Sequence, residues 1–521
     1  PFGLANDQRI QTTPEVNVMK AVLLLFDSLN RRALSCYDGN VPTPNFDRLK
    51  KHTTIFDKHF VGSMPCMPAR RDLQTGRLNF MHRSWGPLEP YDVTLTSLLA
   101  KQGVHSHLAT DHYHYFKPGG ANYHSAFTTW DFIRGQEADP WSTTVNPSTQ
   151  RLREEFHKDQ LETDRFGFRY QALLNRNRIR DLPDFPGVRT FDAGLNFLEE
   201  NHDADNWFLQ LETFDPHEPF FAPKEFRDCF PTSYTGPTFD WPRYRRAGVE
   251  SEDEAANLRA NYAALVAMCD AQLGRLLDEF DRQEMWEDTA LIVTTDHGFL
   301  LGEHDWWGKN RMPFYNEIAH IPLMVHMPGR PRAKRCSALS QNIDVMATIL
   351  DLYGIERPAS VQGRSLVPVL EGAKGRDIAL YGIFGGAVNA TDGFYSYFRY
   401  PPDMEAHELF EYTLMPQHST TPFAPEELYS ATLHPGFRFS QGVPLLKVSA
   451  TADAKRPPMQ GGGFEDTATV LYDLVSDPDQ TQPIEDSVIE EKFLMAIASE
   501  MALHEAPVEL YERFEIARVK E

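Results

Sequence analysis

The chain has 521 residues, of which 41% are hydrophobic and 24% are charged, as in a soluble globular enzyme and unlike a disordered or fibrous protein. Its 51 lysine and arginine residues against 74 aspartate and glutamate residues give a formal net charge of −23, which argues against nucleic acid as a partner. No apolar stretch approaches the roughly 20 residues that cross a bilayer, so no membrane partner is expected. The 5 cysteines form no CxxC pair, which indicates neither a disulfide framework nor a zinc site.

The first 18 residues are polar and lack the apolar segment of a signal peptide. Met19 directly precedes a strand-like run, so residues 1–18 are interpreted as an N-terminal extension or a scar left by cloning. The lack of an apolar segment favours a cytoplasmic location. A periplasmic location is the alternative if an export signal has been removed.

Short apolar runs alternate with helix-like patterns, which predicts an α/β fold with a large, mostly parallel sheet covered by helices on both faces. The expected strands are 21–26, 104–109, 207–211, 290–294 and 321–325. Before the fourth strand, apolar residues from Leu258 to Phe280 recur at helical spacing and predict an amphipathic helix. Beyond about residue 375 the pattern changes to short strands, turn-rich stretches and a long closing helix from about Glu490.

This organisation predicts a catalytic domain over residues 19–375 and a smaller C-terminal α+β subdomain over residues 376–521. In parallel sheets, ligands bind outside the carboxyl ends of the strands. Polar residues gather at the predicted strand ends, namely Asp27, Asp111, Asp215, His217, Asp296 and His297. The functional site is therefore expected at this edge of the sheet.

A long motif contains the candidate nucleophile. It has the pattern C-x-P-x-R…L-x-T-G-R, formed by Cys66, Pro68, Arg70, Leu73, Thr75, Gly76 and Arg77. The motif resembles the signature of type I sulfatases, members of the alkaline phosphatase superfamily, and further matches extend from about residue 20 to residue 480. The resemblance implies an alkaline-phosphatase-like fold. It also implies that a separate formylglycine-generating maturation enzyme oxidises Cys66, whose hydrated aldehyde then attacks the sulfate ester.

The resemblance also implies roles for residues near the nucleophile. Arg70 is expected to hold the oxygens of the nucleophile and to offset charge that develops on the sulfate. Asp27, Asp296 and His297 resemble the metal-binding positions of the family, where a divalent cation lowers the pKa of the nucleophile. Many members carry a second aspartate where Ser28 stands and an asparagine where His297 stands. Calcium is expected first, and manganese is the alternative because His297 offers nitrogen.

Two further regions resemble the substrate contacts of the family. His217, in an Asp-Pro-His loop, is the expected general acid for the departing oxygen, and Lys309 is expected to bind the sulfate. Many sulfatases carry a lysine and a histidine after the strand expected at 104–109. Here Asp111 stands at the lysine position, and His112 or His114 takes the place of the histidine. The missing lysine leaves less positive charge around the anion.

The leading interpretation is a sulfuric ester hydrolase, a sulfatase that acts on a sulfate ester of a saccharide or another small molecule. A phosphonate monoester or phosphodiester hydrolase is the alternative on the same scaffold, favoured by Asp111, His297 and the stretch 81–84. A catalytically silent binding protein is the third interpretation, and the intact motif around Cys66 argues against it. The sequence predicts no oligomeric state.

Overall fold

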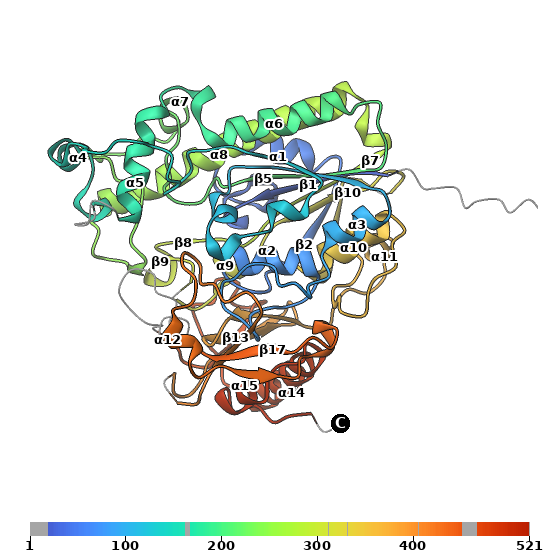
Figure 1. Ribbon diagram of the computed structural model, residues 1–521. Coiled ribbons are helices and arrows are strands. Elements are labelled where there is room, and N and C mark those ends of the chain that lie inside the picture. The colour runs from blue at the N-terminus through green and yellow to red at the C-terminus, as the bar shows by residue number, and fades with distance from the viewer. Residues whose placement is uncertain are drawn as a thin grey trace, which may run out of the picture.

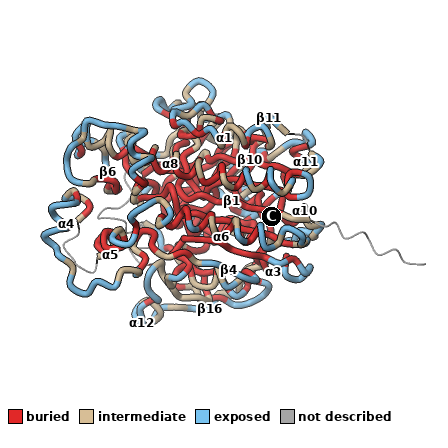
Figure 2. The backbone as a smooth tube through the Cα atoms, turned by 90° about the horizontal axis from the view of Figure 1, so that it is seen from above, coloured by how far each residue is buried: buried red, intermediate tan, exposed pale blue. Residues whose placement is uncertain are grey.

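The computed structural model describes residues 19–161, 167–310, 312–330, 332–404, 406–450 and 466–519. These residues form a large α/β unit and a smaller unit below it in the view of Figure 1. Buried segments fill the interior around β1 and α8, while peripheral segments such as α4 are largely exposed (Figure 2). The predicted extension, residues 1–18, lies outside the described residues.

An eight-stranded sheet forms the centre of the large unit, in the order β11-β2-β10-β7-β1-β5-β3-β4. Its strands are β1 (Lys20–Phe26), β2 (Thr54–Phe60), β3 (His105–Thr110), β4 (Thr129–Phe132), β5 (Trp207–Thr213), β7 (Thr289–Thr295), β10 (Leu323–His326) and β11 (Lys334–Gln341). The predicted mostly parallel sheet is confirmed, and β10 is the antiparallel exception, between β2 and β7. Strands β2, β4 and β11 were not predicted from the sequence.

Helices cover both faces of this sheet, as predicted. One face packs on α1 (Pro44–Leu49), α6 (Pro186–Glu200) and α8 (Glu252–Arg282), and the other on α2 (Cys66–Thr75), α3 (Leu95–Lys101), α10 (Asp344–Leu352) and α11 (Val367–Leu370). Side chains of β1 enter the two cores alternately, because successive residues of a strand point to opposite faces. A central strand is therefore apolar along its whole length.

The predicted amphipathic helix is α8, which extends beyond the apolar residues that indicated it. It starts at a capping box, in which Ser251 and Glu254 each accept a backbone N–H at the helix start. The shorter elements of the large unit are α4 (Thr149–Glu155), α5 (Phe168–Asn175), α7 (Lys224–Arg227), α9 (Asn316–Ala319), β6 (Arg245–Arg246), β8 (Leu300–Leu301) and β9 (Trp306–Gly308). The last three form a small antiparallel sheet.

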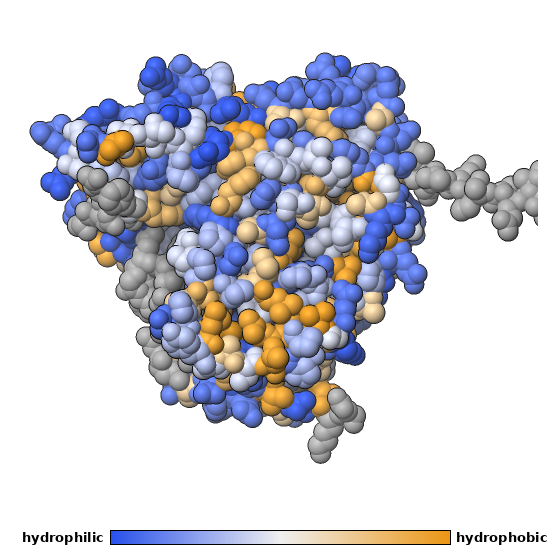
Figure 3. All heavy atoms as spheres, in the orientation of Figure 1, coloured by the Kyte–Doolittle hydropathy of each residue, from blue (hydrophilic) through white to orange (hydrophobic). Residues whose placement is uncertain are grey.

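The smaller unit consists of antiparallel sheets and closing helices. One sheet has the order β12 (Ala379–Ile383), β13 (Ala387–Thr391), β14 (Tyr395–Arg399) and β18 (Val470–Asp473), and the other has the order β15 (Phe410–Thr413), β17 (Leu445–Ser449) and β16 (Thr432–His434). The helices are α12 (Pro425–Leu428), α14 (Ser487–Leu503) and α15 (Val508–Arg513). Apolar residues gather over this unit on the face seen in Figure 3.

The closing helix is interrupted, unlike the single helix that was expected. After α14 the chain turns at Glu505, whose φ is 57°, and α15 starts after Pro507. Proline favours a helix start and cannot continue a helix, because it lacks the backbone N–H.

The two units share a core: Leu78 and Phe80, which follow α2, pack with residues of β12–β14 and α14. Strand β12 begins four residues after the predicted boundary at 375, and the domain limits stay a prediction. Among the described residues, none of the helices combines the length and the apolarity that a membrane crossing requires.

Candidate active site

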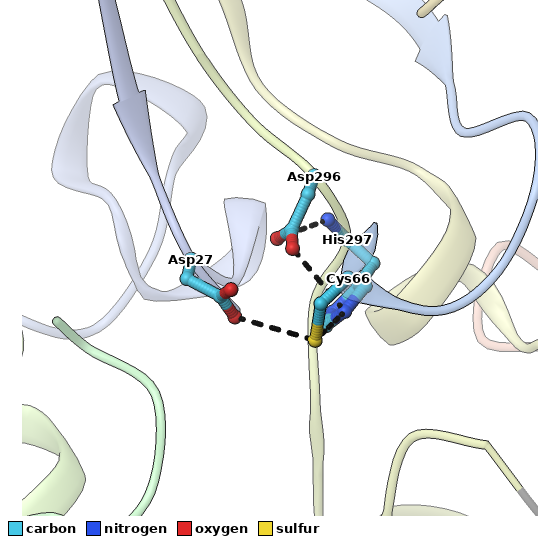
Figure 4. A group of neighbouring side chains, drawn as sticks. All are labelled: Asp27, Cys66, Asp296 and His297. Atoms are coloured by element: carbon cyan, nitrogen blue, oxygen red, sulfur yellow. Dashed lines mark hydrogen bonds and ion pairs between the residues drawn. The ribbon is translucent and has the colours of Figure 1, made fainter. Parts of the chain in front are cut away.

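The ends of two neighbouring strands bring the predicted metal ligands together. Strands β1 and β7 are parallel with Phe26 opposite Thr295, so Asp27 and Asp296 follow at the same level of the sheet. Ligand atoms of Asp27, Cys66, Asp296 and His297 all lie within 4.8 Å of one another, and the four residues are buried (Figure 4). The structure therefore places the candidate nucleophile among the candidate ligands.

The turn after β7 fixes the orientation of His297. Its Nδ1 lies 3.0 Å from the carbonyl oxygen of Gly298, so Nδ1 bears the proton and Nε2 presents a lone pair. Burial, with Lys309 next, lowers the pKa of His297 well below its usual range, which favours the neutral form that binds metals. A Cβ on Gly298 would lie 1.9 Å from the carbonyl oxygen of Glu317, so this turn requires glycine.

Cys66 is the first residue of α2, and its Sγ faces the strand ends. Sγ lies 3.3 Å from His297 Nε2 and 4.0 Å from Asp27 Oδ1. Burial raises the pKa of the Cys66 thiol well above its usual range, and the Asp27 carboxylate adds to this. An unmodified thiol here stays protonated and is a weak nucleophile. The surroundings of residue 66 are suited to a catalytic nucleophile, but the unmodified thiol is a poor one.

Arg70 lies one helical turn after Cys66 and binds three buried carboxylates. Its guanidinium contacts Asp27 Oδ2 at 2.9 Å, Glu212 Oε1 at 2.7 Å and Asp296 Oδ2 at 2.6 Å. Burial lowers the pKa of Arg70, but Glu212, Asp296 and Asp27 outweigh it and raise the pKa well above its usual value. Arg70 therefore stays charged and holds two candidate metal ligands in place.

Glu212 is a site residue that the sequence analysis missed. It lies near the end of β5, fully buried, and its second oxygen accepts hydrogen bonds from Tyr115 Oη at 2.8 Å and Gln210 Nε2 at 2.7 Å. The expected strand ended at residue 211, one position earlier. An acidic residue directly after an apolar run was the available signal, because a buried carboxylate needs a cation.

Lys309 reaches the same edge from the other side. Its Nζ donates to Ser28 Oγ at 2.9 Å and lies 3.4 Å from Glu218 Oε2. Ser28 Oγ in turn donates to Asp27 Oδ1 at 2.8 Å. Burial lowers the pKa of Lys309, but the carboxylates of Glu218, Asp27 and Asp296 raise it above its usual value, so this buried amine keeps its charge.

The loop that bears His217 is held by Asp111. Asp111 Oδ1 accepts the backbone N–H of Phe214 at 2.7 Å, and the Phe214 ring packs on the His217 ring with centroids 4.1 Å apart. His217 Nδ1 lies 2.5 Å from the carbonyl oxygen of Glu218. Burial, followed by Asp215, raises the pKa of Asp111 well above its usual range. Asp111 thus anchors a loop, and its surroundings disfavour its charged form.

His112 and His114 have different partners. His112 Nε2 lies 3.2 Å from Asp27 Oδ2, whereas His114 Nε2 lies 3.2 Å from Glu137 Oε2. The two rings are in contact, with centroids 4.9 Å apart. Burial, followed by Arg70, lowers the pKa of His112 to about 3, so it is neutral. Both candidates adjoin the site, and His112 is the one that touches a candidate metal ligand.

The donor set fits a divalent cation. Burial and the neighbouring Asp27 raise the pKa of Asp296 to about 7, and a cation bound between the two carboxylates would offset this repulsion. Two carboxylates and one neutral imidazole are ligands that divalent metals bind. With Arg70 and Lys309 on the two sides, the arrangement can bind an anionic group next to residue 66.

The sequence matches two family models, one described as Sulfatase over residues 20–355 and one described as N-sulphoglucosamine sulphohydrolase, C-terminal, over residues 302–412. It is 24% identical to the N-acetylglucosamine-6-O-sulfatase of Bacteroides thetaiotaomicron, with 77% of each chain covered. It is 28% identical to the multifunctional alkaline phosphatase superfamily protein PehA of Trinickia caryophylli, covering 64% of this chain and 72% of that protein. Human iduronate 2-sulfatase is 26% identical, with 62% of each chain covered.

Solved structures share the fold. A protein in complex with its substrate D-glucosamine-2-N,6-O-disulfate matches with a TM-score of 0.63 at 16% identity, over 94% of this chain and 99% of that one. The phosphonate monoester hydrolase of Agrobacterium radiobacter matches with a TM-score of 0.62 at 19% identity, over 93% of this chain and 96% of that one. At these identities the likeness concerns the alkaline-phosphatase-like fold alone.

Proposed function

The chain belongs to the sulfatase family, and from this premise we propose that it is a hydrolase of sulfate esters on carbohydrates. The observation that carries the proposal is the buried cluster of Asp27, Cys66, Asp296 and His297. Support for a saccharide comes from relatives that are named for sulfated sugars, the N-acetylglucosamine-6-O-sulfatase and iduronate 2-sulfatase, and from the related structure that holds a sulfated glucosamine.

The family implies a divalent metal and a formylglycine at residue 66. The proposed metal ligands are Asp27, Asp296 and His297. When bound, a divalent cation lowers the pKa of the attacking oxygen and neutralises charge on the ester. Calcium is proposed first because it prefers carboxylate oxygens, and manganese is the alternative because of the His297 nitrogen.

The remaining roles belong to side chains around this cluster. Arg70 and Lys309 keep their positive charge when buried, so they bind the oxygens of the sulfate group and orient the ester. His217 donates a proton to the departing oxygen, with its ring held by Glu218 and Phe214. Asp111 accepts the backbone N–H of Phe214 and so holds the loop that bears His217 in place.

Conversion of Cys66 requires a separate maturation enzyme. The C-x-P-x-R motif around Cys66 supports this partner, and the raised pKa of the thiol explains why the unconverted side chain is unreactive. The cytoplasmic location stays a prediction.

A phosphonate monoester hydrolase is the second candidate. The observation that favours it is the nitrogen ligand His297, whose Nε2 lies 3.3 Å from Cys66 Sγ. The similarity to PehA and to the phosphonate monoester hydrolase structure adds to it. Both reactions use an oxygen nucleophile against a tetrahedral oxyanion, so the fold does not distinguish them.

The deciding experiment compares an aryl sulfate and an aryl phosphonate monoester with the same leaving group. The protein is first shown by peptide mass to carry formylglycine at residue 66. We expect the sulfate to be hydrolysed with the higher kcat/KM, and 6-sulfated glucosamine to release sulfate. A preference for the phosphonate by orders of magnitude would assign the second function instead.

A further inference from the structure

Glu137 is a buried carboxylate next to the site that none of the roles above uses. It follows β4, and its φ of 41° is in the left-handed region, which residues with a Cβ adopt only at a cost in free energy. Asn175 Nδ2 donates to the carbonyl oxygens of Glu137 at 3.1 Å and Asp139 at 2.8 Å, which holds this backbone in place. The strained backbone directs the carboxylate to His114.

The hydrogen bonds of Glu137 decide the tautomer of His114. Glu137 Oε2 accepts the Tyr113 hydroxyl at 2.7 Å and lies 3.2 Å from His114 Nε2. The oxygen that accepts the Tyr113 hydroxyl also accepts the Nε2–H of His114, which leaves a lone pair on His114 Nδ1. That Nδ1 is buried and has no hydrogen-bond partner among the residues that the structure describes. Burial, followed by Lys117, lowers the pKa of His114 well below its usual range, in agreement with a neutral ring.

Trp85 contributes a second unpaired polar group against the His114 ring. Its ring packs edge-on against His114 with centroids 5.3 Å apart. Within the described part of the chain, the Trp85 Nε1–H is also buried without an acceptor. Unpaired buried polar groups are costly and rare. A hydroxyl group donates and accepts at once, so a single hydroxyl can satisfy both atoms.

These unpaired atoms lie beside the proposed reaction. The His114 ring contacts His112, which reaches Asp27, and it also contacts Phe214 with centroids 5.7 Å apart. Phe214 packs on His217, the proposed general acid. His114 therefore contacts one residue on the metal-ligand side of the site, His112, and one on the general-acid side, Phe214.

We propose that His114 and Trp85 bind a hydroxyl group adjacent to the sulfate ester of the substrate. The hydroxyl donates to His114 Nδ1 and accepts from Trp85 Nε1, while Glu137 is a positioning residue that holds the His114 tautomer. A sulfate oxygen has no proton to offer to Nδ1, so this pair does not bind the sulfate itself. The inference rests on the proposed sulfatase function and narrows it to esters with a neighbouring hydroxyl, as in partly sulfated sugars.

Three aryl sulfates test this assignment on protein that carries formylglycine: phenyl sulfate, 2-hydroxyphenyl sulfate and 2-methoxyphenyl sulfate. Sulfate release is followed by ion chromatography, and the hydroxyl preference is kcat/KM for the hydroxy compound divided by that for each of the other two. The methoxy compound keeps the oxygen but carries a methyl group in place of the proton, so it donates no hydrogen bond. We expect the native protein to prefer the hydroxy compound, and His114→Phe to reduce this preference by about tenfold.

Further variants separate the parts of the assignment. Trp85→Phe keeps an aromatic ring and removes the N–H, so it reduces the hydroxyl preference by a smaller factor. If His114→Phe does not fold, Trp85→Phe is the variant that tests the assignment. Glu137→Gln admits either tautomer of His114 and reduces the preference about threefold. Asp344→Asn changes a buried carboxylate that is paired with Arg376 away from the site, so it is the matched control and leaves the preference unchanged.

The outcomes distinguish this inference from the proposed function. If the native protein hydrolyses all three sulfates without preferring the hydroxyl, the inference is wrong and the sulfatase function stands. The same holds if His114→Phe lowers kcat/KM equally for all three, because His114 then acts on the sulfate or on folding. If none of the three aryl sulfates, nor 6-sulfated glucosamine, is hydrolysed, the proposed function fails and the inference fails with it.

Discussion

The charged edge of the large sheet and the hydrophobic core of the smaller unit differ in the side chains that they bury. At the carboxyl edge of the large sheet, charged groups are almost completely buried, namely Asp27, Arg70, Glu212, Asp296 and Lys309. The core of the smaller unit is apolar instead, with Leu380, Val388, Tyr397, Phe493, Ile497 and Met501. Buried charges cost free energy unless they are paired, whereas buried apolar side chains stabilise the fold. Substitutions at the sheet edge should therefore reduce turnover, whereas substitutions in the core of the smaller unit should reduce stability.

The largest effect is expected at the nucleophile. Cys66→Ala removes the side chain that is converted, so turnover should fall to background, by roughly four orders of magnitude or more. The thiol forms no ion pair, and the folded state should be retained, which circular dichroism and thermal unfolding can check. Undiminished turnover in this variant would refute residue 66 as the nucleophile.

Asp296→Asn should come next, because it removes one of two carboxylates from the cation site. Metal content, measured by mass spectrometry on dialysed protein, should fall well below that of the native chain, and turnover should fall by about two to three orders of magnitude. Asp344→Asn is a matched control, since Asp344 is also buried and paired with an arginine, Arg376, away from the site. Full metal content in D296N would exclude Asp296 as a ligand.

A substitution in the core of the smaller unit should lower stability and leave turnover unchanged. Phe493→Ala leaves a cavity in the core between α14 and β14, and it should lower the free energy of unfolding by about 3–5 kcal/mol. Urea unfolding measures this loss, and kcat is measured at a temperature where the variant is folded. We expect an unchanged kcat. A parallel loss of kcat would show that the two regions are not independent.

The smallest effect concerns pH. His504 Nδ1 accepts the backbone N–H of Leu78 at 3.3 Å, and burial lowers the pKa of His504 to about 3, against about 6.5 in an unfolded chain. Because the unfolded chain binds this proton first, the free energy of unfolding decreases as pH falls from about 6.5 towards 3, by at most about 1.4 kcal/mol per pH unit. His504→Asn keeps an acceptor and does not titrate, so its acid-induced decrease should be shallower. Urea unfolding at pH 7, 6 and 5 would reveal equal slopes if His504 contributes nothing.

The site was predictable from the sequence where its residues belong to a motif or follow an apolar strand. Cys66 and Arg70 lie in one short pattern, and Asp27 and Asp296 directly follow strongly apolar runs. Glu137 has neither signal, and Glu212 follows an apolar run but belongs to no motif. The partner of Glu212 is Arg70, 142 positions away, and the carboxylate of Glu137 reaches His114 only because the loop after β4 takes a strained conformation.

The sequence by itself determined the class of fold and the candidate nucleophile, because hydrophobic periodicity and short motifs are local properties of the chain. Tertiary structure decided which carboxylates pair with Arg70, which histidine touches Asp27, and that Asp111 anchors a loop. It also decided the antiparallel direction of β10. These features depend on contacts between distant segments: Arg70 and Asp296 are 226 positions apart, and only the packing of α2 against the ends of β1 and β7 brings their charges together.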